Sequence, residues 1–141
     1  MDRIIIDAAD HVAGRLASVA AREALKGKRV EIVNAEKAVI SGNNKYIINI
    51  FRERIQRGDP FKGPHYPRRA DMLLKRMIRG MLPYKKPSGR NAYKRVKVFL
   101  SLPEEYKKER PVRIKKAENK LRCSYISLEK LSERIGAKKH A

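Results

Sequence analysis

Ile4-Ile5-Ile6-Asp7 is a run of three β-branched residues ended by an acidic one, and it is typical of a strand buried on both faces of a sheet. Residues 13–26 then place small and apolar side chains at helical spacing, and Gly27 is a plausible end for this helix. A second strand is predicted at residues 30–33. The order strand, helix, strand predicts a parallel sheet with a right-handed crossover, and therefore an α/β fold.

The same periodicity predicts further elements outward from this unit, and Pro and Gly mark the breaks between them. The expected helices cover residues 45–56, 70–82 and 127–135; a strand covers 96–100; and loops or irregular segments cover 59–69, 84–95 and 104–120.

Positive charge is concentrated in the middle of the chain. The formal net charge of the 141 residues is +20, and residues 51–100 carry 15 Lys and Arg but only 3 Asp and Glu. Such a field repels itself in a free compact protein, and a polyanion neutralises it. Nucleic acid is the first candidate and an anionic membrane surface is the weaker one. No apolar stretch reaches the roughly 18 residues of a membrane span. The charged fraction of 35% fits an RNA-coated surface and also a heat-adapted protein.

The predicted helix over 70–82 separates apolar from basic side chains. Its two sides are Leu73, Leu74, Met77, Ile78 and Met81, and opposite them Arg69, Lys75, Arg76 and Arg79. Exposed helices usually interleave Glu with Lys, whereas Asp59 and Asp71 are the only acidic residues between Gln56 and Leu102. Arginines without carboxylate partners suit phosphate, which they bind through a planar, bidentate fork. We therefore predict that nucleic acid contacts the basic side.

The loops on either side of this helix mix aromatic, basic and backbone-exposing residues. They are Phe61-Lys62-Gly63-Pro64-His65-Tyr66-Pro67-Arg68-Arg69 and Tyr84-Lys85-Lys86-Pro87-Ser88-Gly89-Arg90-Asn91-Ala92-Tyr93-Lys94-Arg95. Extended basic loops of this kind follow an RNA backbone and stack on unpaired bases. For each tyrosine, packing at the edge of the domain is the alternative.

Residues 7–15, between the first strand and the first helix, invite a nucleotide-site interpretation but contain neither Gly-x-Gly-x-x-Gly nor Gly-x-x-x-x-Gly-Lys-Ser/Thr. Asp7, Asp10 and His11 could act as acid and base or bind a metal, but carboxylates at a strand end more often cap the next helix. We predict no enzyme, no metal, no cofactor and no small-molecule substrate. The single cysteine, Cys123, excludes an intrachain disulfide and is expected to be buried.

Two functions of other classes stay open on these residues. One is a small nucleotide-dependent enzyme on a Rossmann-like sheet, against which the missing glycine pattern argues. The other is a general DNA-compacting protein, against which the irregular basic loops argue, because they suit folded RNA better than duplex.

Several stretches, taken in order, resemble the large-subunit ribosomal protein L-thirteen family in its archaeal and eukaryotic form. They are Ile6-Asp7-Ala8, Gly14-Arg15-Leu16-Ala17-Ser18, Val33-Asn34-Ala35-Glu36-Lys37, Ile40-Ser41-Gly42-Asn43, Arg76-Met77-Ile78-Arg79-Gly80-Met81-Leu82-Pro83-Tyr84-Lys85 and Lys97-Val98-Phe99. The resemblance implies a structural constituent of the large ribosomal subunit in the cytoplasm, which binds large-subunit ribosomal RNA, contacts neighbouring ribosomal proteins and supports subunit assembly and translation. It also implies a three-layer α/β/α sandwich around a four-stranded parallel sheet.

Two segments are expected within this architecture. Residues 1–106 form the α/β RNA-binding domain, with its basic loops and helix at 59–95, and residues 107–141 form a basic C-terminal extension whose short helix packs on the same domain. The predicted RNA-binding residues are Arg15, Lys37, Lys45, Lys62, His65, Tyr66, Arg68, Arg69, Lys75, Arg76, Arg79, Lys85, Lys86, Arg90 and Lys94.

Overall fold

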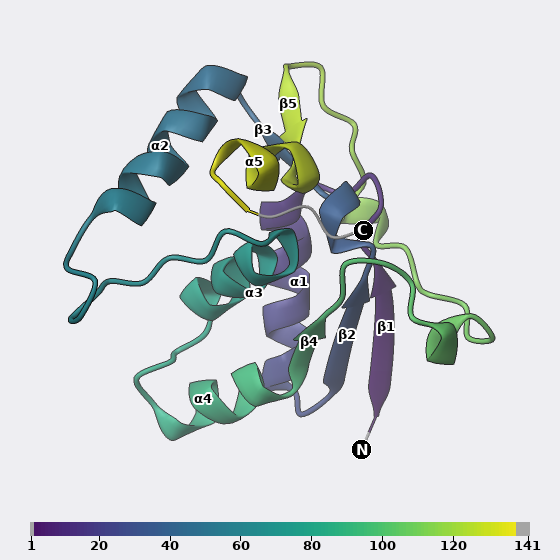
Figure 1. The fold of residues 1–141 in the computed structure, drawn as a ribbon. Coiled ribbons are helices and arrows are strands. Elements are labelled where there is room, and N and C mark those ends of the chain that lie inside the picture. Colours follow the sequence, from purple (N-terminus) through teal and green to yellow (C-terminus); the bar gives the residue numbers. More distant parts are fainter. Residues whose placement is uncertain (1, 138–141) are drawn as a thin grey trace.

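A parallel sheet of three strands forms the centre of the molecule. The computed structural model describes residues 2–137, and its strands β1 (Arg3–Asp7), β2 (Arg29–Val33) and β4 (Val96–Val98) lie in the order β1-β2-β4. Figure 1 shows helix α1 (Ala13–Leu25), which connects β1 to β2, lying alongside the sheet. The predicted α/β class and the elements of the first unit are confirmed.

The expected fourth parallel strand is not confirmed. Strand β3 (Val39–Ser41) instead pairs antiparallel with β5 (Tyr125–Ser127) in a separate two-stranded sheet, with Ile40 opposite Ile126. Only residues 34–38 separate β2 from β3, and Ala35–Lys37 among them form a 3₁₀ turn. A parallel neighbour needs a crossover of about a dozen residues or more, so β3 cannot return to the edge of the main sheet.

Most of the hydrophobic core lies between the sheet and the helices α1, α3 (Ala70–Met81) and α5 (Leu128–Arg134), while α2 (Asn44–Gln56) lies at the periphery in Figure 1. The fully buried side chains of this core include Ile6, Leu16, Ile32, Leu73, Leu74, Ile78, Leu128 and Leu131.

The second face of the sheet is covered differently, by a small cluster of Ile5, Val33 and Tyr106. Within the described chain this cover includes the 3₁₀ turn Glu104–Tyr106 and no α-helix, so the expected three-layer α/β/α arrangement is not confirmed. Phe99 and Leu102 complete the cluster from the segment that follows β4.

The predicted loop at 84–95 is wrong in its second half, because residues Pro87–Lys94 form helix α4. Pro87 occupies the first turn, where the missing N–H costs nothing and the fixed φ suits a helix. Gly89 is buried at a close approach: a Cβ there would lie 2.0 Å from the carbonyl oxygen of Pro83. Contacts with α1 and with the turn at Pro83 therefore stabilise as a helix a Pro-Ser-Gly sequence whose composition alone predicts a turn.

The chain beyond β4 returns along the free edge of β1, as Figure 1 shows for the segment after residue 100. The backbone of Val112 donates to the carbonyl oxygen of Ile5 (2.8 Å) and accepts from the N–H of Asp7 (3.1 Å). Further along, Cys123 is exposed, so the expectation that it is buried is wrong. A strand at Tyr125–Ser127, which the sequence analysis did not predict, leads into α5.

Candidate nucleic-acid interface

Helix α3 forms the centre of the candidate site because it is fixed on one side and basic on the other. Leu73, Leu74 and Ile78 are fully buried in the core. The basic residues of this helix, Lys75, Arg76 and Arg79, are all half-buried. We call these three residues the basic side of α3. The predicted division of this helix into two sides is confirmed, except that Met81 is exposed and not part of the core.

Each cation on the basic side of α3 lies over an aromatic ring from a neighbouring element. The three pairs are Lys75 over Tyr93 at 4.9 Å, Arg76 over Tyr66 at 5.7 Å and Arg79 over Tyr84 at 4.2 Å from the ring centroid. Such contacts are worth roughly 0.5–1 kcal/mol at exposed sites. They hold long side chains in place without neutralising their charge.

No carboxylate forms an ion pair with Lys75, Arg76 or Arg79 among the residues that the structure describes. Arg69 differs from them, because its guanidinium lies 3.1 Å from the carboxylate of Asp71. The three unpaired cations are therefore the stronger candidates for phosphate contact.

A pocket of about 550 Å³ opens at the C-terminal end of α3, between this helix and the turn at residues 82–86. Its lining consists of Arg76, Arg79, Gly80, Leu82, Pro83, Tyr84, Lys85 and Lys86, with no acidic residue. The ring of Tyr84 meets the ring of Tyr93 edge to face at 5.6 Å. Burial raises the pKa of the Tyr93 hydroxyl, an effect that Arg79 partly offsets. The pocket therefore combines four cations with one aromatic ring, that of Tyr84, and this lining suits a phosphate-bearing ligand.

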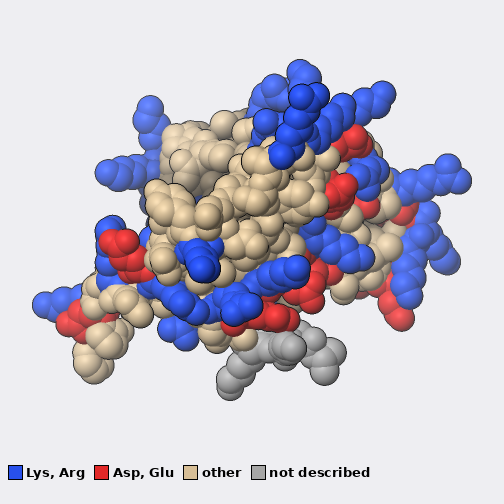
Figure 2. All heavy atoms as spheres, turned by 90° about the horizontal axis from the view of Figure 1, so that it is seen from above, with Lys and Arg blue, Asp and Glu red and all other residues tan. Residues whose placement is uncertain are grey.

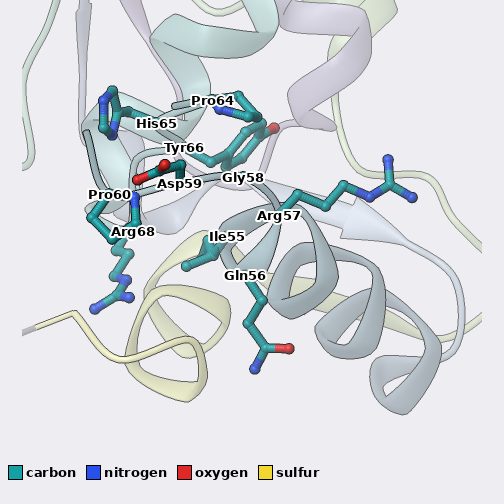
Figure 3. Close-up of a pocket in the computed structure, with 10 residues that line it drawn as sticks. All are labelled: Ile55, Gln56, Arg57, Gly58, Asp59, Pro60, Pro64, His65, Tyr66 and Arg68. Carbon is teal, nitrogen blue, oxygen red and sulfur yellow. The ribbon is translucent and has the colours of Figure 1, made fainter. Parts of the chain in front are cut away.

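A second, smaller pocket of about 330 Å³ lies where α2 passes into the loop at residues 57–69, which we call the α2–α3 loop. Figure 3 shows Tyr66 beside Pro64 in this pocket, while the side chain of Arg57 extends away from it. Tyr66 is half-buried and meets the ring of Phe51 edge to face at 6.0 Å. The packing alternative for a tyrosine therefore describes Tyr66, although its ring also lies 5.9 Å from the guanidinium of Arg54.

Basic side chains extend well beyond these two pockets. Figure 2, which views the molecule from above, shows Lys and Arg projecting around the rim of one face, with fewer acidic side chains between them.

Residues 2–105 of the chain match the protein family described as Ribosomal protein L13.

The chain belongs to the ribosomal protein L13 family.

Relatives from archaea match almost the whole chain, and each carries the name large ribosomal subunit protein uL13. The protein of Methanopyrus kandleri is 44% identical over 94% of this chain and 86% of its own length. The proteins of Methanosarcina barkeri and Methanocaldococcus jannaschii are each 44% identical over 95% of this chain and 98% of their own lengths. Like these relatives, the present L13-family chain continues past residue 105, where the family match ends.

The other predicted RNA-binding residues of this L13-family chain are all exposed, but they occupy different parts of the surface. Lys62, His65 and Arg68 lie in the α2–α3 loop; Lys85 and Lys86 lie in the turn at 82–86; Arg90 and Lys94 lie on α4; and Arg15, Lys37 and Lys45 lie on α1, the 3₁₀ turn after β2 and the first turn of α2. The last three therefore lie outside α3 and the segments that flank it.

The turn after β1, which holds the acidic and histidine side chains considered for catalysis, is a structural joint in this L13-family chain. His11 is fully buried, its Nδ1 donates to the carbonyl oxygen of Ala9 (2.8 Å), and its Nε2 accepts from the N–H of Ile114 (3.2 Å). Asp7 accepts from the N–H of Ala9 (2.9 Å), and helix α1 has no side-chain cap, contrary to the capping expected of these carboxylates. Both ring nitrogens of His11 thus form hydrogen bonds with backbone groups.

Among the described residues there is no group of three or more His, Cys, Asp or Glu that could hold a metal, and no helix long and apolar enough to cross a membrane.

Two features of the interface were missed at the sequence level. One is the pair of rings of Tyr84 and Tyr93, which supports Arg79 and Lys75, and the other is helix α4, whose last turn carries Tyr93. Pro87 was the available signal, because proline is favoured in the first turn of a helix as well as in loops. No local signal shows which ring faces which cation, since the partners come from different elements.

Proposed function

We propose that the protein is a structural constituent of the large ribosomal subunit that binds large-subunit ribosomal RNA and functions there in the cytoplasm, in subunit assembly and translation. The observation that carries this proposal is the set of unpaired cations on α3 and the turn at 82–86, set in a chain whose relatives are named large-subunit proteins. The protein contributes no chemical step; it contributes a rigid, positively charged surface.

The basic side of α3 binds phosphates of folded RNA. Because Arg76 and Arg79 rest on aromatic rings, their side chains lose little further rotational freedom when they bind. A guanidinium bonds two phosphate oxygens in parallel, and an ammonium such as that of Lys85 adds a point charge. Contacts of this type position a protein on RNA by shape and backbone more than by base sequence.

The division of labour along the chain belongs to the same proposal. Residues 1–106 provide the RNA-binding surface, and residues 107–141 form the extension that supports it and contacts neighbouring ribosomal proteins. Leu128, Leu131 and Ile135 of the extension lie in the same core cluster as α3, which supports this assignment. Residues 138–141 lie outside the described residues.

The test is a pair of matched double variants measured on protein-free large-subunit rRNA over a series of salt concentrations. Arg76→Ala with Arg79→Ala should weaken binding about 10-fold or more and reduce the slope of log affinity against log salt by about 1 to 2. Lys26→Ala with Lys28→Ala removes the same charge at the end of α1, where Glu23 pairs with both lysines, and should change both quantities little.

Equal losses in the two double variants would show that net charge alone governs binding, and the interface on α3 would be wrong. Sedimentation of native lysate provides the second test, in which the protein should travel with the large subunit through a moderate-salt wash. Competition with duplex DNA separates the proposal from DNA compaction, because duplex should displace rRNA poorly.

A further inference from the structure

We propose that Phe61 is a base-stacking residue, whose ring packs on an unpaired base of the RNA. This inference rests on the proposed function and adds to it a contact that is not made to phosphate. The side chain of Phe61 is 94% exposed, more than any other large hydrophobic side chain in the described chain. An aromatic ring left almost wholly in water gains from a partner that covers it.

The backbone around Phe61 forms a turn closed by hydrogen bonds, so the exposed ring is attached to a fixed backbone. The N–H of Asp59 donates to the carbonyl oxygen of Gly63 (3.2 Å), and the N–H of Gly63 donates back to that of Asp59 (2.8 Å). Within this turn the carboxylate of Asp59 accepts from the N–H of Phe61 (2.9 Å). Gly58 lets the two arms approach, because a Cβ there would lie 2.2 Å from the oxygen of Gly63.

The charge around the turn identifies the class of partner. Lys62 follows Phe61 directly, and neither it nor the nearby Arg68 pairs with a carboxylate in the described part of the chain. The single acid of the turn, Asp59, is already engaged by the N–H of Phe61. A ring flanked by free cations suits a ligand that carries π-faces and phosphates together, which is single-stranded RNA.

The tyrosine ring of the α2–α3 loop is engaged within the protein. Tyr66 is half-buried against Phe51, with Arg54 and Arg76 beside it. Tyr66 therefore contributes to the shape of the loop, whereas the ring of Phe61 has its faces free for an RNA base.

The experiment compares Phe61→Ala, Phe61→Leu and Phe61→Trp with Tyr46→Ala in binding to protein-free large-subunit rRNA at several salt concentrations. Tyr46 is the control because it is also a largely exposed aromatic residue (67%) but lies on α2. Stacking is worth about 1–3 kcal/mol per base, which corresponds to roughly a 5-fold to 150-fold change in affinity. We expect a loss of that size, with an unchanged salt slope, for Phe61→Ala and Phe61→Leu. Phe61→Trp should bind as tightly as the wild type or more tightly, and the control Tyr46→Ala should bind as the wild type does.

Several outcomes would overturn the inference. Binding by Phe61→Leu at the wild-type level would show that apolar bulk suffices and that no aromatic face is needed at this position. Binding by Phe61→Ala at the wild-type level, while Arg76→Ala with Arg79→Ala binds weakly, would remove the stacking role and leave the proposed function standing. Absence of rRNA binding by the unaltered protein would remove both. Thermal melting of each variant checks that the exposed substitutions leave the fold intact.

Discussion

Arg79 illustrates how a single residue on this surface keeps its charge and its position at the same time. Its guanidinium lies 4.2 Å from the centroid of Tyr84, and no carboxylate of the described chain pairs with it. A salt bridge would hold the side chain equally well but would leave less net charge for a phosphate. Under the proposed function, ring contacts therefore order these side chains before RNA binds.

Glu36 is the residue for which pH should matter most visibly. Its Oε2 is buried without a hydrogen-bond partner, and burial raises the pKa of the Glu36 carboxyl above its ordinary value, although the backbone N–H of Glu36 and the charge of Lys37 offset part of this. The folded state therefore binds this proton more tightly than the unfolded state. The resulting stability is present below the ordinary glutamate pKa and is lost as pH rises through the raised pKa.

Glu36→Gln should consequently be more stable than the unaltered protein at neutral pH, and the difference should shrink as the solution is acidified below the ordinary glutamate range. Denaturant midpoints measured over this pH series provide the test. Glu105→Gln, at an exposed position, is the control and should show no such trend. A Glu36→Gln difference that is independent of pH would contradict the argument.

At the scale of elements, the two glycines next to the larger pocket should respond in opposite ways to the same substitution. A Cβ at Gly89 would meet the backbone of Pro83, so Gly89→Ala should displace the turn at 82–86 and cost about 1–3 kcal/mol of stability. A Cβ at Gly80, on α3, has nothing within 4 Å, so Gly80→Ala should stabilise the protein by about 0.5–1 kcal/mol.

Thermal or denaturant unfolding measures both effects, and rRNA binding should weaken in Gly89→Ala because Tyr84 and Lys85 lie in the displaced turn. If the two variants had equal stability, α4 would not be held against the turn as closely as the structure shows.

Elements with long, regular patterns could be predicted from the sequence. The strand at Ile4-Ile5-Ile6 and helices α1, α2 and α3 were placed within a residue or two, because their periodicity is local. The pairing of β3 with β5 could not be predicted, because each strand has three residues and Ile40 and Ile126 lie far apart in the chain. For the candidate site, the basic side of α3 was visible in the spacing, whereas the rings that support it come from three other segments.

For the whole molecule, the net charge of +20 makes stability depend on ionic strength. Repulsion between like charges destabilises the compact free protein, and salt screens it over a Debye length of about 10 Å at 0.1 M. The melting temperature should therefore rise by a few degrees from low to moderate NaCl, and rRNA at low salt should raise it further. A melting temperature that falls with salt would mean that attractive surface pairs, such as Glu23 with Lys26 and Lys28, outweigh the repulsion.

The backbone bonds between the turn after β1 and the returning segment bear on how the chain matures. His11 and Ile114 are separated by 103 positions, so the imidazole is synthesised long before the backbone N–H of Ile114, from which its Nε2 accepts a hydrogen bond. The free edge of β1 likewise lacks its backbone hydrogen bonds until Val112 has been made. A nascent chain can form its first strand–helix–strand unit early, but that unit gains these bonds only after residues 112–114 have been made. A product terminated before residue 112 therefore has an unpaired edge at β1 and a His11 imidazole that lacks its hydrogen bond from Ile114.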